Sequence, residues 1–226
     1  MRVDALTVGM FQSNAYIVSC EKTKEAVLID AGDEADRIVN RIRSEELELK
    51  MIVATHGHID HVGALPEISE TLSVPVFMHR DELPVYRGID RQAMLFGLQS
   101  PQILDIENFL ADGDRIQIGE LAGRVIHTPG HSPGGITIAF DAEEPPRAFV
   151  GDVLFRGSIG RTDLMGANPR KMFDVLKNVF LAMPDETVIY SGHGPDTKLR
   201  TSGADSACLI PNSRALSRRK SNSSGV

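Results

Sequence analysis

The sequence THGHIDH, residues 55–61, contains four side chains that can bind a metal ion: His56, His58, Asp60 and His61. Side chains alternate between the two faces of an extended chain, so His56 and His58 point to the same side. Imidazole and carboxylate ligands suit zinc, iron or manganese, and the lack of cysteine among them disfavours a purely structural zinc site. The alternative is a histidine-rich surface loop with Asp60 as a helix cap, which does not account for the defined spacing. We therefore expect a metal site at this motif.

Short apolar runs around the motif predict strands, and amphipathic stretches predict helices. Strands are predicted at residues 3–8, 14–19, 26–30, 51–54, 75–78, 115–118, 124–127, 135–140, 148–151 and 187–191. Helices are predicted at residues 34–48, 62–72, 81–98 and 169–182. Strands interrupted by single helices favour an α/β fold of two mixed sheets packed face to face with helices outside, rather than a regular βαβ repeat.

Three more candidate ligands follow predicted strands: His131, Asp152 and His193. Both histidines lie in glycine-containing loops, TPGHSPGG and SGHGP, where glycine lets the backbone come close to a site. Asp152 ends the apolar run FVGD, and a carboxylate can bridge two cations and offset part of their repulsion. Each residue alone is more often a loop, turn or capping residue, but together with the motif they indicate ligands.

Composition and charge narrow the class of protein. The 226 residues are 42% hydrophobic, which is enough for one substantial core, and no interior stretch resembles a linker. The net charge of −7 disfavours nucleic acid or an anionic membrane surface as the main partner. The two cysteines have no metal-site spacing and allow at most one disulfide. An acidic residue at position 4 does not fit a secretory signal, so we expect a cytoplasmic protein.

The last 26 residues differ from the rest. Residues 201–226 contain seven serines, and four basic residues against one acidic give a net charge of +3, which leaves −10 on the preceding part. Such a segment buries little apolar surface, so we expect a domain at residues 1–200 and a flexible or non-native tail. A functional basic tail is the other interpretation.

The spacing of His56, His58, Asp60 and His61, followed in order by His131, Asp152 and His193, resembles the metallo-β-lactamase superfamily. Five segments are similar to the glyoxalase II branch, the hydroxyacylglutathione hydrolases: LIDAG at 28–32, TPGHSPG at 128–134, GD at 151–152, GSIGRTD at 157–163 and SGHGP at 191–195. The C-terminal helical domain of full-length glyoxalase II has no counterpart here. The chain therefore resembles the short, single-domain type.

This resemblance implies an αβ/βα four-layer sandwich with two divalent metal ions at one edge of the sheets. One ion would be held by His56, His58 and His131, the other by Asp60, His61 and His193, with Asp152 between them. Zinc is the expected metal, and iron or manganese are the alternatives. Asp30 and Thr55 would support the ligands, although Asp30 also fits a turn residue that ends a strand.

The implied activity is hydrolysis of a thioester such as S-lactoylglutathione or a related acyl-glutathione. A hydroxide shared by the metals would be the nucleophile, oriented by Asp60, and a thiolate leaves without a dedicated general acid. Arg161 would attract a substrate carboxylate or pair with Asp163. The alternatives are a mononuclear-iron persulfide dioxygenase, a hydrolase of lactones or other esters, and a binding protein that has lost catalysis. A β-lactamase fits less well, because lactam hydrolases fill the position of Asp152 differently.

Overall fold

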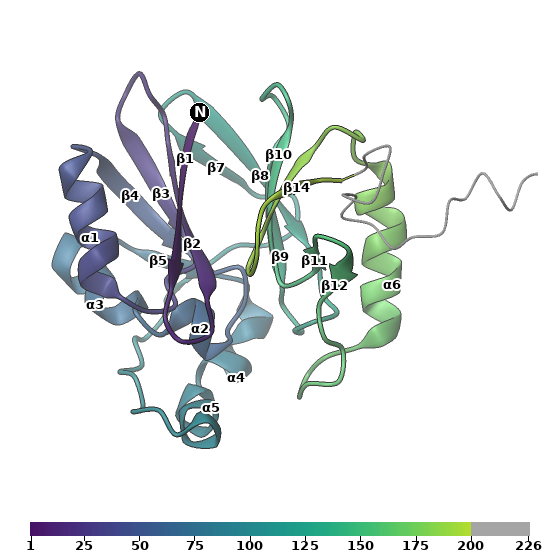
Figure 1. The fold of residues 1–226 in the computed structure, drawn as a ribbon, viewed down its shortest axis with the longest axis horizontal. Coiled ribbons are helices and arrows are strands. Elements are labelled where there is room, and N and C mark those ends of the chain that lie inside the picture. Colours follow the sequence, from purple (N-terminus) through teal and green to yellow (C-terminus); the bar gives the residue numbers. More distant parts are fainter. Residues whose placement is uncertain (200–226) are drawn as a thin grey trace, which may run out of the picture.

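Two six-stranded β-sheets pack face to face, and helices cover the outer face of each (Figure 1). The computed structural model describes residues 1–199. The order of layers is helix, sheet, sheet and helix, which is the expected αβ/βα sandwich. The tail expected at residues 201–226 lies outside the described residues. Within residues 1–199, no helix has the length and apolar character needed to cross a membrane.

The first sheet contains the strands of the N-terminal half in chain order. Its members are β1 (Arg2–Val8), β2 (Ser13–Ser19), β3 (Glu25–Ile29), β4 (Glu48–Val53), β5 (Val76–Met78) and β6 (Asn108–Phe109). The pairs β1–β2 and β2–β3 are antiparallel, whereas β3, β4, β5 and β6 run parallel. The carboxyl ends of the parallel strands therefore lie at one edge of the sheet.

The second sheet has the strand order β14-β13-β10-β9-β8-β7. Its members are β7 (Arg115–Ile118), β8 (Leu121–His127), β9 (Ile136–Phe140), β10 (Arg147–Gly151), β13 (Val188–Ser191) and β14 (Thr197–Lys198). The pair β10–β13 is parallel, and the other neighbours are antiparallel. A short hairpin follows β10 and consists of β11 (Leu154–Phe155) and β12 (Ser158–Ile159).

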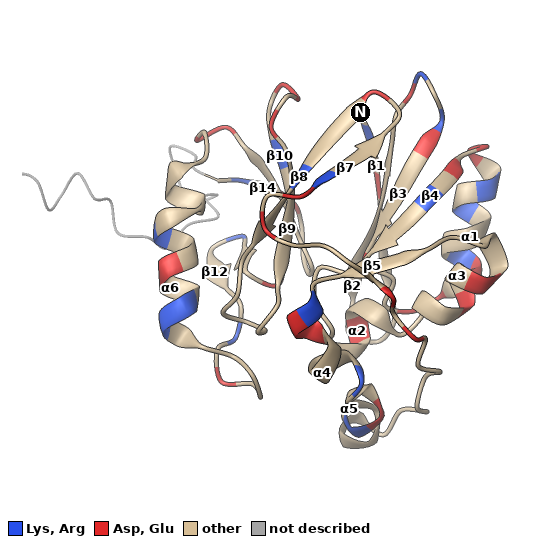
Figure 2. Ribbon diagram, turned by 180° about the vertical axis from the view of Figure 1, so that it is seen from behind, with Lys and Arg blue, Asp and Glu red and all other residues tan. Residues whose placement is uncertain are grey.

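The helices divide between the two outer layers. Those that follow strands of the first sheet are α1 (Ala35–Ser44), α2 (Ile59–Val62), α3 (Leu65–Leu72), the 3-10 turn η1 (Arg80–Glu82), α4 (Leu83–Tyr86) and α5 (Ile89–Phe96). The second sheet is covered by α6 (Pro169–Asn178), followed by η2 (Phe180–Ala182). Figure 2 shows charged residues of both signs on α1 and α6. Their opposite faces bury an apolar stripe, such as Ile38, Val39 and Ile42 in α1.

Apolar side chains fill the spaces between the layers. The space between the sheets is packed with residues of both, among them Val18, Ile29, Ile138 and Phe140. Each fully buried side chain of this size contributes about 1.5–3 kcal/mol relative to an exposed one. The packed double sheet therefore holds the ends of its strands in fixed positions.

The predicted strands differ from the observed ones by at most three residues at an end, but the helices differ more. The helix predicted at 34–48 ends at Ser44, because Glu46 has a left-handed φ of 54° and β4 begins at Glu48. The helix predicted at 62–72 is two helices, α2 and α3, separated at Gly63 and Ala64. The stretch predicted at 81–98 contains η1, α4 and α5, and the helix predicted at 169–182 ends as η2.

Candidate metal centre

All seven predicted ligands lie where strands end, at one edge of the double sheet. His56 and His58 follow β4, and Asp60 and His61 lie in α2. His131 lies in the loop between β8 and β9, and Asp152 and His193 follow β10 and β13, respectively. The parallel pairs β3–β4 and β10–β13 bring residues far apart in sequence to the same place.

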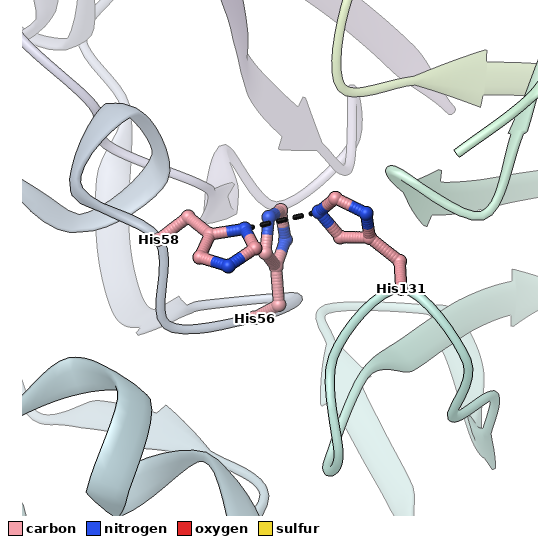
Figure 3. A group of neighbouring side chains, drawn as sticks. All are labelled: His56, His58 and His131. Carbon is pink, nitrogen blue, oxygen red and sulfur yellow. Dashed lines mark hydrogen bonds between the residues drawn. The ribbon is translucent and has the colours of Figure 1, made fainter. Parts of the chain in front are cut away.

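The side chains of His56, His58 and His131 form one group, in which each offers a nitrogen within 4.8 Å of the others. Figure 3 shows the three rings turned toward one another from two loops. His58 Nδ1 lies 2.9 Å from His131 Nε2. The ring of His56 lies edge-on to both, with centroid distances of 4.8 Å to His58 and 5.0 Å to His131.

A second group consists of Asp60, His61 and His193. His193 Nε2 lies 3.1 Å from Asp60 Oδ2 and 3.4 Å from His61 Nε2. Asp152 lies between the two groups. Its Oδ1 is 3.5 Å from His61 Nε2, and its Oδ2 is 3.6 Å from His193 Nε2 and 3.7 Å from His131 Nε2.

This arrangement fits divalent metal ions. His56 Nε2 and Asp152 Oδ1 are buried without a hydrogen-bond partner, which is a costly state for polar atoms. Two ligand atoms that each lie about 2.1 Å from a tetrahedral ion are roughly 3.4 Å apart, similar to the spacings found here. Imidazole nitrogens and carboxylate oxygens are suitable ligands for such ions.

A chain of hydrogen bonds behind the centre orients two of the histidines. Asp30 Oδ2 accepts from His61 Nδ1 at 2.9 Å and from the Thr55 hydroxyl at 2.8 Å. The same hydroxyl accepts a hydrogen bond from His56 Nδ1 at 3.0 Å, and Asp30 Oδ1 accepts one from the Thr55 backbone N–H at 2.7 Å. Both Nδ1 atoms are thus donors, which leaves Nε2 of His56 and His61 free to face the centre.

Backbone carbonyls orient two further histidines. His131 Nδ1 donates to the carbonyl of Arg161 at 2.9 Å, and His193 Nδ1 donates to the carbonyl of Phe11 at 3.1 Å. The guanidinium of Arg161 instead forms two 3.0 Å hydrogen bonds with Asp163 and is 68% exposed. The structure therefore shows the ion pair with Asp163 that the sequence left open, and Arg161 supports the centre through its backbone.

Burial keeps three of the histidines neutral in the metal-free protein. Burial and the neighbouring His131 lower the pKa of His58 to about 3. Burial and the neighbouring His61 lower the pKa of His56 well below its ordinary value, and burial lowers the pKa of His131. Neutral imidazole is the form that binds a metal ion.

Carboxylates have the opposite effect on His61. Burial acts to lower its pKa, but Asp60, Asp152 and Asp30 together raise it to about 10. Burial likewise acts to raise the pKa of Asp60, and His61 and His193 hold it below its ordinary value. Asp60 is therefore ionised, and the negative potential of the three carboxylates attracts cations.

Two glycines allow the ligands to approach one another. A Cβ atom on Gly192 would collide with Asp152 Oδ1, and one on Gly151 would collide with the Thr55 hydroxyl. Gly151 also has a φ of 52°, which glycine adopts without strain. Any side chain at these positions would displace a residue of the centre.

Sequence reasoning missed the residues that hold the His193 segment. Asn14 on β2 donates to the carbonyls of Ser191 at 3.0 Å and Gly194 at 2.8 Å. The Tyr16 hydroxyl donates to the Ser191 carbonyl at 2.6 Å. The available signal was a polar amide in the otherwise apolar run SNAYIV, which the structure shows to be fully buried.

A cavity of about 210 Å³ has Asp60 among its lining residues, and the other six candidate ligands do not line it. Met10, Phe11 and Leu98 contribute apolar surface to it, whereas Asp33, Glu34 and Glu67 contribute carboxylates. Phe11 also packs edge-on against Phe96 of α5 at a centroid distance of 4.8 Å. The cavity thus offers space next to Asp60 for part of a small molecule.

Known proteins resemble this chain over most of its length. The family profile "Metallo-beta-lactamase superfamily" matches residues 8–193. The "Probable metallo-hydrolase YqgX" of Bacillus subtilis is 33% identical over 204 residues, which cover 89% of this chain and 94% of the relative. The "Hydroxyacylglutathione hydrolase GloC" of Haemophilus influenzae is 32% identical over 206 residues, which cover 88% of this chain and 93% of the relative.

Solved structures agree with these matches. The structure described as "BLEG-1 B3 metallo-beta-lactamase" has a TM-score of 0.80 and 33% identity, and the match covers 88% of this chain and 94% of that one. The structure of "TTHA1623 in a di-iron-bound form" has a TM-score of 0.77 and 40% identity, with coverage of 87% and 95%. Profile, relatives and fold agree with the ligand motif, and this chain belongs to the metallo-β-lactamase superfamily.

Proposed function

We propose that the protein is a binuclear metal-dependent hydrolase that cleaves thioesters, with S-lactoylglutathione or a related acyl-glutathione as the substrate. The observation that carries this proposal is the pair of ligand groups, His56/His58/His131 and Asp60/His61/His193, with Asp152 between them. Two divalent ions held by these residues would act as Lewis acids and lower the pKa of the nucleophilic water toward ~7. We propose zinc as the metal, with iron or manganese as the alternatives.

Asp60 is the proposed catalytic residue among the ligands. Its carboxylate is ionised and lies 3.1 Å from His193 Nε2, and Asp60 is among the residues that line the cavity beside the centre. Asp60 can therefore accept a proton from the attacking water and orient this water toward the carbonyl carbon of the substrate. The leaving group is a thiolate, whose conjugate acid has a pKa near 8.5, so no separate general acid is required.

Hydrogen bonds from behind the centre hold the ligands in one geometry. Asp30 and Thr55 fix the ring planes of His61 and His56, and the carbonyl of Arg161 fixes that of His131. Preorganised ligands of this kind avoid a rearrangement during the reaction. The exposed guanidinium of Arg161 is paired with Asp163, so we propose a substrate contact for it only after that ion pair opens.

The cavity beside Asp60 supports an assignment for one end of the substrate. Its apolar residues Met10, Phe11 and Leu98 suit an uncharged acyl group. Its three carboxylates, Asp33, Glu34 and Glu67, disfavour the carboxylates of glutathione. We therefore place the acyl part of the thioester here and the glutathione part outside.

Relatives support the reaction class. The name of GloC states hydroxyacylglutathione hydrolysis, and YqgX is named a probable metallo-hydrolase. The 33% identical BLEG-1 structure is described as a B3 metallo-beta-lactamase, which favours β-lactam hydrolysis as a second candidate. The di-iron form of TTHA1623 is a reason to test iron beside zinc.

The test is hydrolysis of S-lactoylglutathione by protein loaded with Zn²⁺ or Fe²⁺, with the metal content measured in the same sample. A His58→Ala variant should lose turnover, and Glu70→Gln on the exposed face of α3 should retain it. Nitrocefin, a lactone and glutathione persulfide with oxygen are assayed in parallel. Persulfide-dependent oxygen uptake with one iron per chain would replace the thioesterase proposal by a dioxygenase. Turnover of nitrocefin or the lactone, without turnover of S-lactoylglutathione, would replace the thioester by that substrate in the proposal.

A further inference from the structure

Glu82 is a fully buried carboxylate, 0% exposed, that does not belong to either ligand group. It ends η1, the turn that follows β5. Its Oε2 accepts the backbone N–H of Gly57 at 2.7 Å, and its Oε1 accepts the backbone N–H of Gly134 at 2.6 Å. One side chain thus joins two loops that are distant in sequence.

Those two loops carry all three residues of the first ligand group. Gly57 stands between His56 and His58, and Gly134 lies three residues after His131. Among the described contacts, Glu82 accepts no hydrogen bond from Asp60, His61 or His193. Its two hydrogen bonds therefore join the two loops of the first group directly, whereas Asp60 and His61 follow in α2 and His193 lies on a third loop.

The backbone is packed closely around these hydrogen bonds. A Cβ atom on Gly57 would lie 2.8 Å from the backbone nitrogen of Tyr86 and 3.1 Å from Glu82 Oε2. A Cβ atom on Gly134 would lie 2.8 Å from the backbone nitrogen of Glu82. A side chain at either donor position would therefore push against η1 or α4, so both positions require glycine.

A second contact joins the segment of η1 to the His131 loop. The ring of His79 stacks on that of His127 at a centroid distance of 4.3 Å and an angle of 6°. His127 Nε2 donates to the carbonyl of Pro133 at 3.2 Å. The stack and the carboxylate together keep residues 79–82 against the loop.

A buried carboxylate is expensive unless its oxygens are hydrogen-bonded. Burial raises the pKa of Glu82, and the Ser132 side chain and the N–H groups of Gly134 and Gly57 act in the opposite direction. Charge-assisted hydrogen bonds to backbone N–H groups are short and directional. Their geometry is therefore suited to set the spacing between two loops.

We propose that Glu82 is a positioning residue that fixes the His56–His58 loop relative to the His131 loop, and thereby sets metal affinity at the first group alone. The inference rests on the metal centre of the proposed function and not on its substrate. Residues that orient ligands typically change metal affinity by roughly 10- to 100-fold when they are replaced.

The test compares Glu82→Gln and Glu82→Ala in two backgrounds. His193→Ala leaves the first group intact, and His131→Ala leaves the second. Zn²⁺ affinity is measured by competition with a chromophoric chelator, and the visible spectrum of bound Co²⁺ reports ligand geometry. In the His193→Ala background, we expect affinity to fall about tenfold for Gln and up to about 100-fold for Ala, with an altered Co²⁺ spectrum. In the His131→Ala background, we expect less than a twofold change.

Val39→Ala is the control for general destabilisation, because Val39 is buried in α1 and contacts neither loop through a hydrogen bond. It should lower the Tm and leave both affinities unchanged. Equal weakening in both backgrounds, or unchanged affinity at the first group, would overturn the proposal. If Glu82→Ala does not fold, Glu82→Gln alone makes the comparison in both backgrounds. No substrate is used, so failure of the thioesterase proposal leaves this test valid.

Discussion

At the scale of single residues, the Thr55 hydroxyl holds the ring of the candidate ligand His56 in one orientation. It donates to Asp30 and accepts from His56, and it is itself buried. Thr55→Val keeps the shape of the side chain and removes both hydrogen bonds. We expect Zn²⁺ affinity to fall about 10- to 100-fold, as measured by chelator competition.

Thr187→Val is the matched control for this substitution. Thr187 is also buried, but its hydroxyl donates to the carbonyl of Pro184, outside the centre. Its replacement should change stability without changing Zn²⁺ affinity. If both variants bind Zn²⁺ as the unaltered protein does, the hydroxyl of Thr55 does not support the ligand.

The lowered pKa of His58 predicts how the free energy of unfolding of the metal-free protein changes with pH. Burial and His131 lower its pKa from 6.5 in the unfolded chain to about 3 in the folded one. Between these values the unfolded chain binds a proton that the folded chain does not, so this group reduces the free energy of unfolding as the pH falls from 6.5 toward 3. His58→Asn removes the titrating group, and the free energy of unfolding of this variant should decline less steeply.

Urea unfolding of both chelator-treated proteins at pH 7, 6 and 5 measures this difference. His56 and His131, whose pKa values are also lowered, remain in both proteins, and the part of the His56 shift that comes from His58 is lost together with His58. Parallel curves for the two proteins would show that His58 is accessible to protons in the folded state.

At the scale of elements, β2 holds the end of β13 in the other sheet. Asn14 contributes a backbone N–H bond to Gly192 at 2.7 Å in addition to its two amide hydrogen bonds. Asn14→Ala removes the amide contacts and leaves the buried carbonyl of Ser191 and the exposed carbonyl of Gly194 with one donor fewer each, at a cost of about 0.5–1.5 kcal/mol per hydrogen bond. Since His193 lies in this segment, we expect weaker Zn²⁺ binding at the second group, measured in the His131→Ala background.

Asn40→Ala provides the comparison for Asn14, because Asn40 is exposed on α1. This variant should bind Zn²⁺ like the unaltered protein and lose little stability. Equal affinities for the Asn14 and Asn40 variants would show that the segment after β13 keeps its position without β2.

Elements with a strong periodic pattern were predictable, and short or interrupted ones were not. Strands such as β2 and β9 are long apolar runs, whereas β6, β11, β12 and β14 have two residues each and carry no pattern. The breaks at Gly63 and Gly88 interrupt helices whose apolar spacing continues across them. Periodicity describes which face is buried, and it does not locate where a chain turns away from a helix.

The residues of the candidate site also divide into those that the sequence predicts and those that it does not. His56, His58, Asp60 and His61 were recognisable because they lie close together in the sequence with a defined spacing. Glu82 was not, because its partners are backbone N–H groups 25 and 52 residues away. A side chain that bonds to distant backbone leaves no partner residue type to recognise in the sequence.

At the scale of the molecule, the centre lies where the two sheets meet. Two of the seven candidate ligands follow β4 and two lie in α2, both associated with the first sheet, while the other three follow strands of the second. Ions that bind all seven therefore connect the sheets, in addition to the apolar cluster between them and the hydrogen bonds from Asn14 and Tyr16 to the segment after β13. Metal binding should accordingly stabilise the whole fold and not just the local loops.

Removal of metal should lower the Tm of the whole protein. A ligand present at about 1,000 times its Kd stabilises the folded state by about 4 kcal/mol, and 1 kcal/mol corresponds to roughly 2–4 °C for a chain of this size. We therefore expect chelation to lower the Tm by about 8–16 °C in a single transition, measured by calorimetry with and without excess Zn²⁺. His58→Ala, which lacks one ligand of the first group, should show a smaller shift. An unchanged Tm, or loss of structure limited to the loops, would mean that the two sheets hold together without the metal centre.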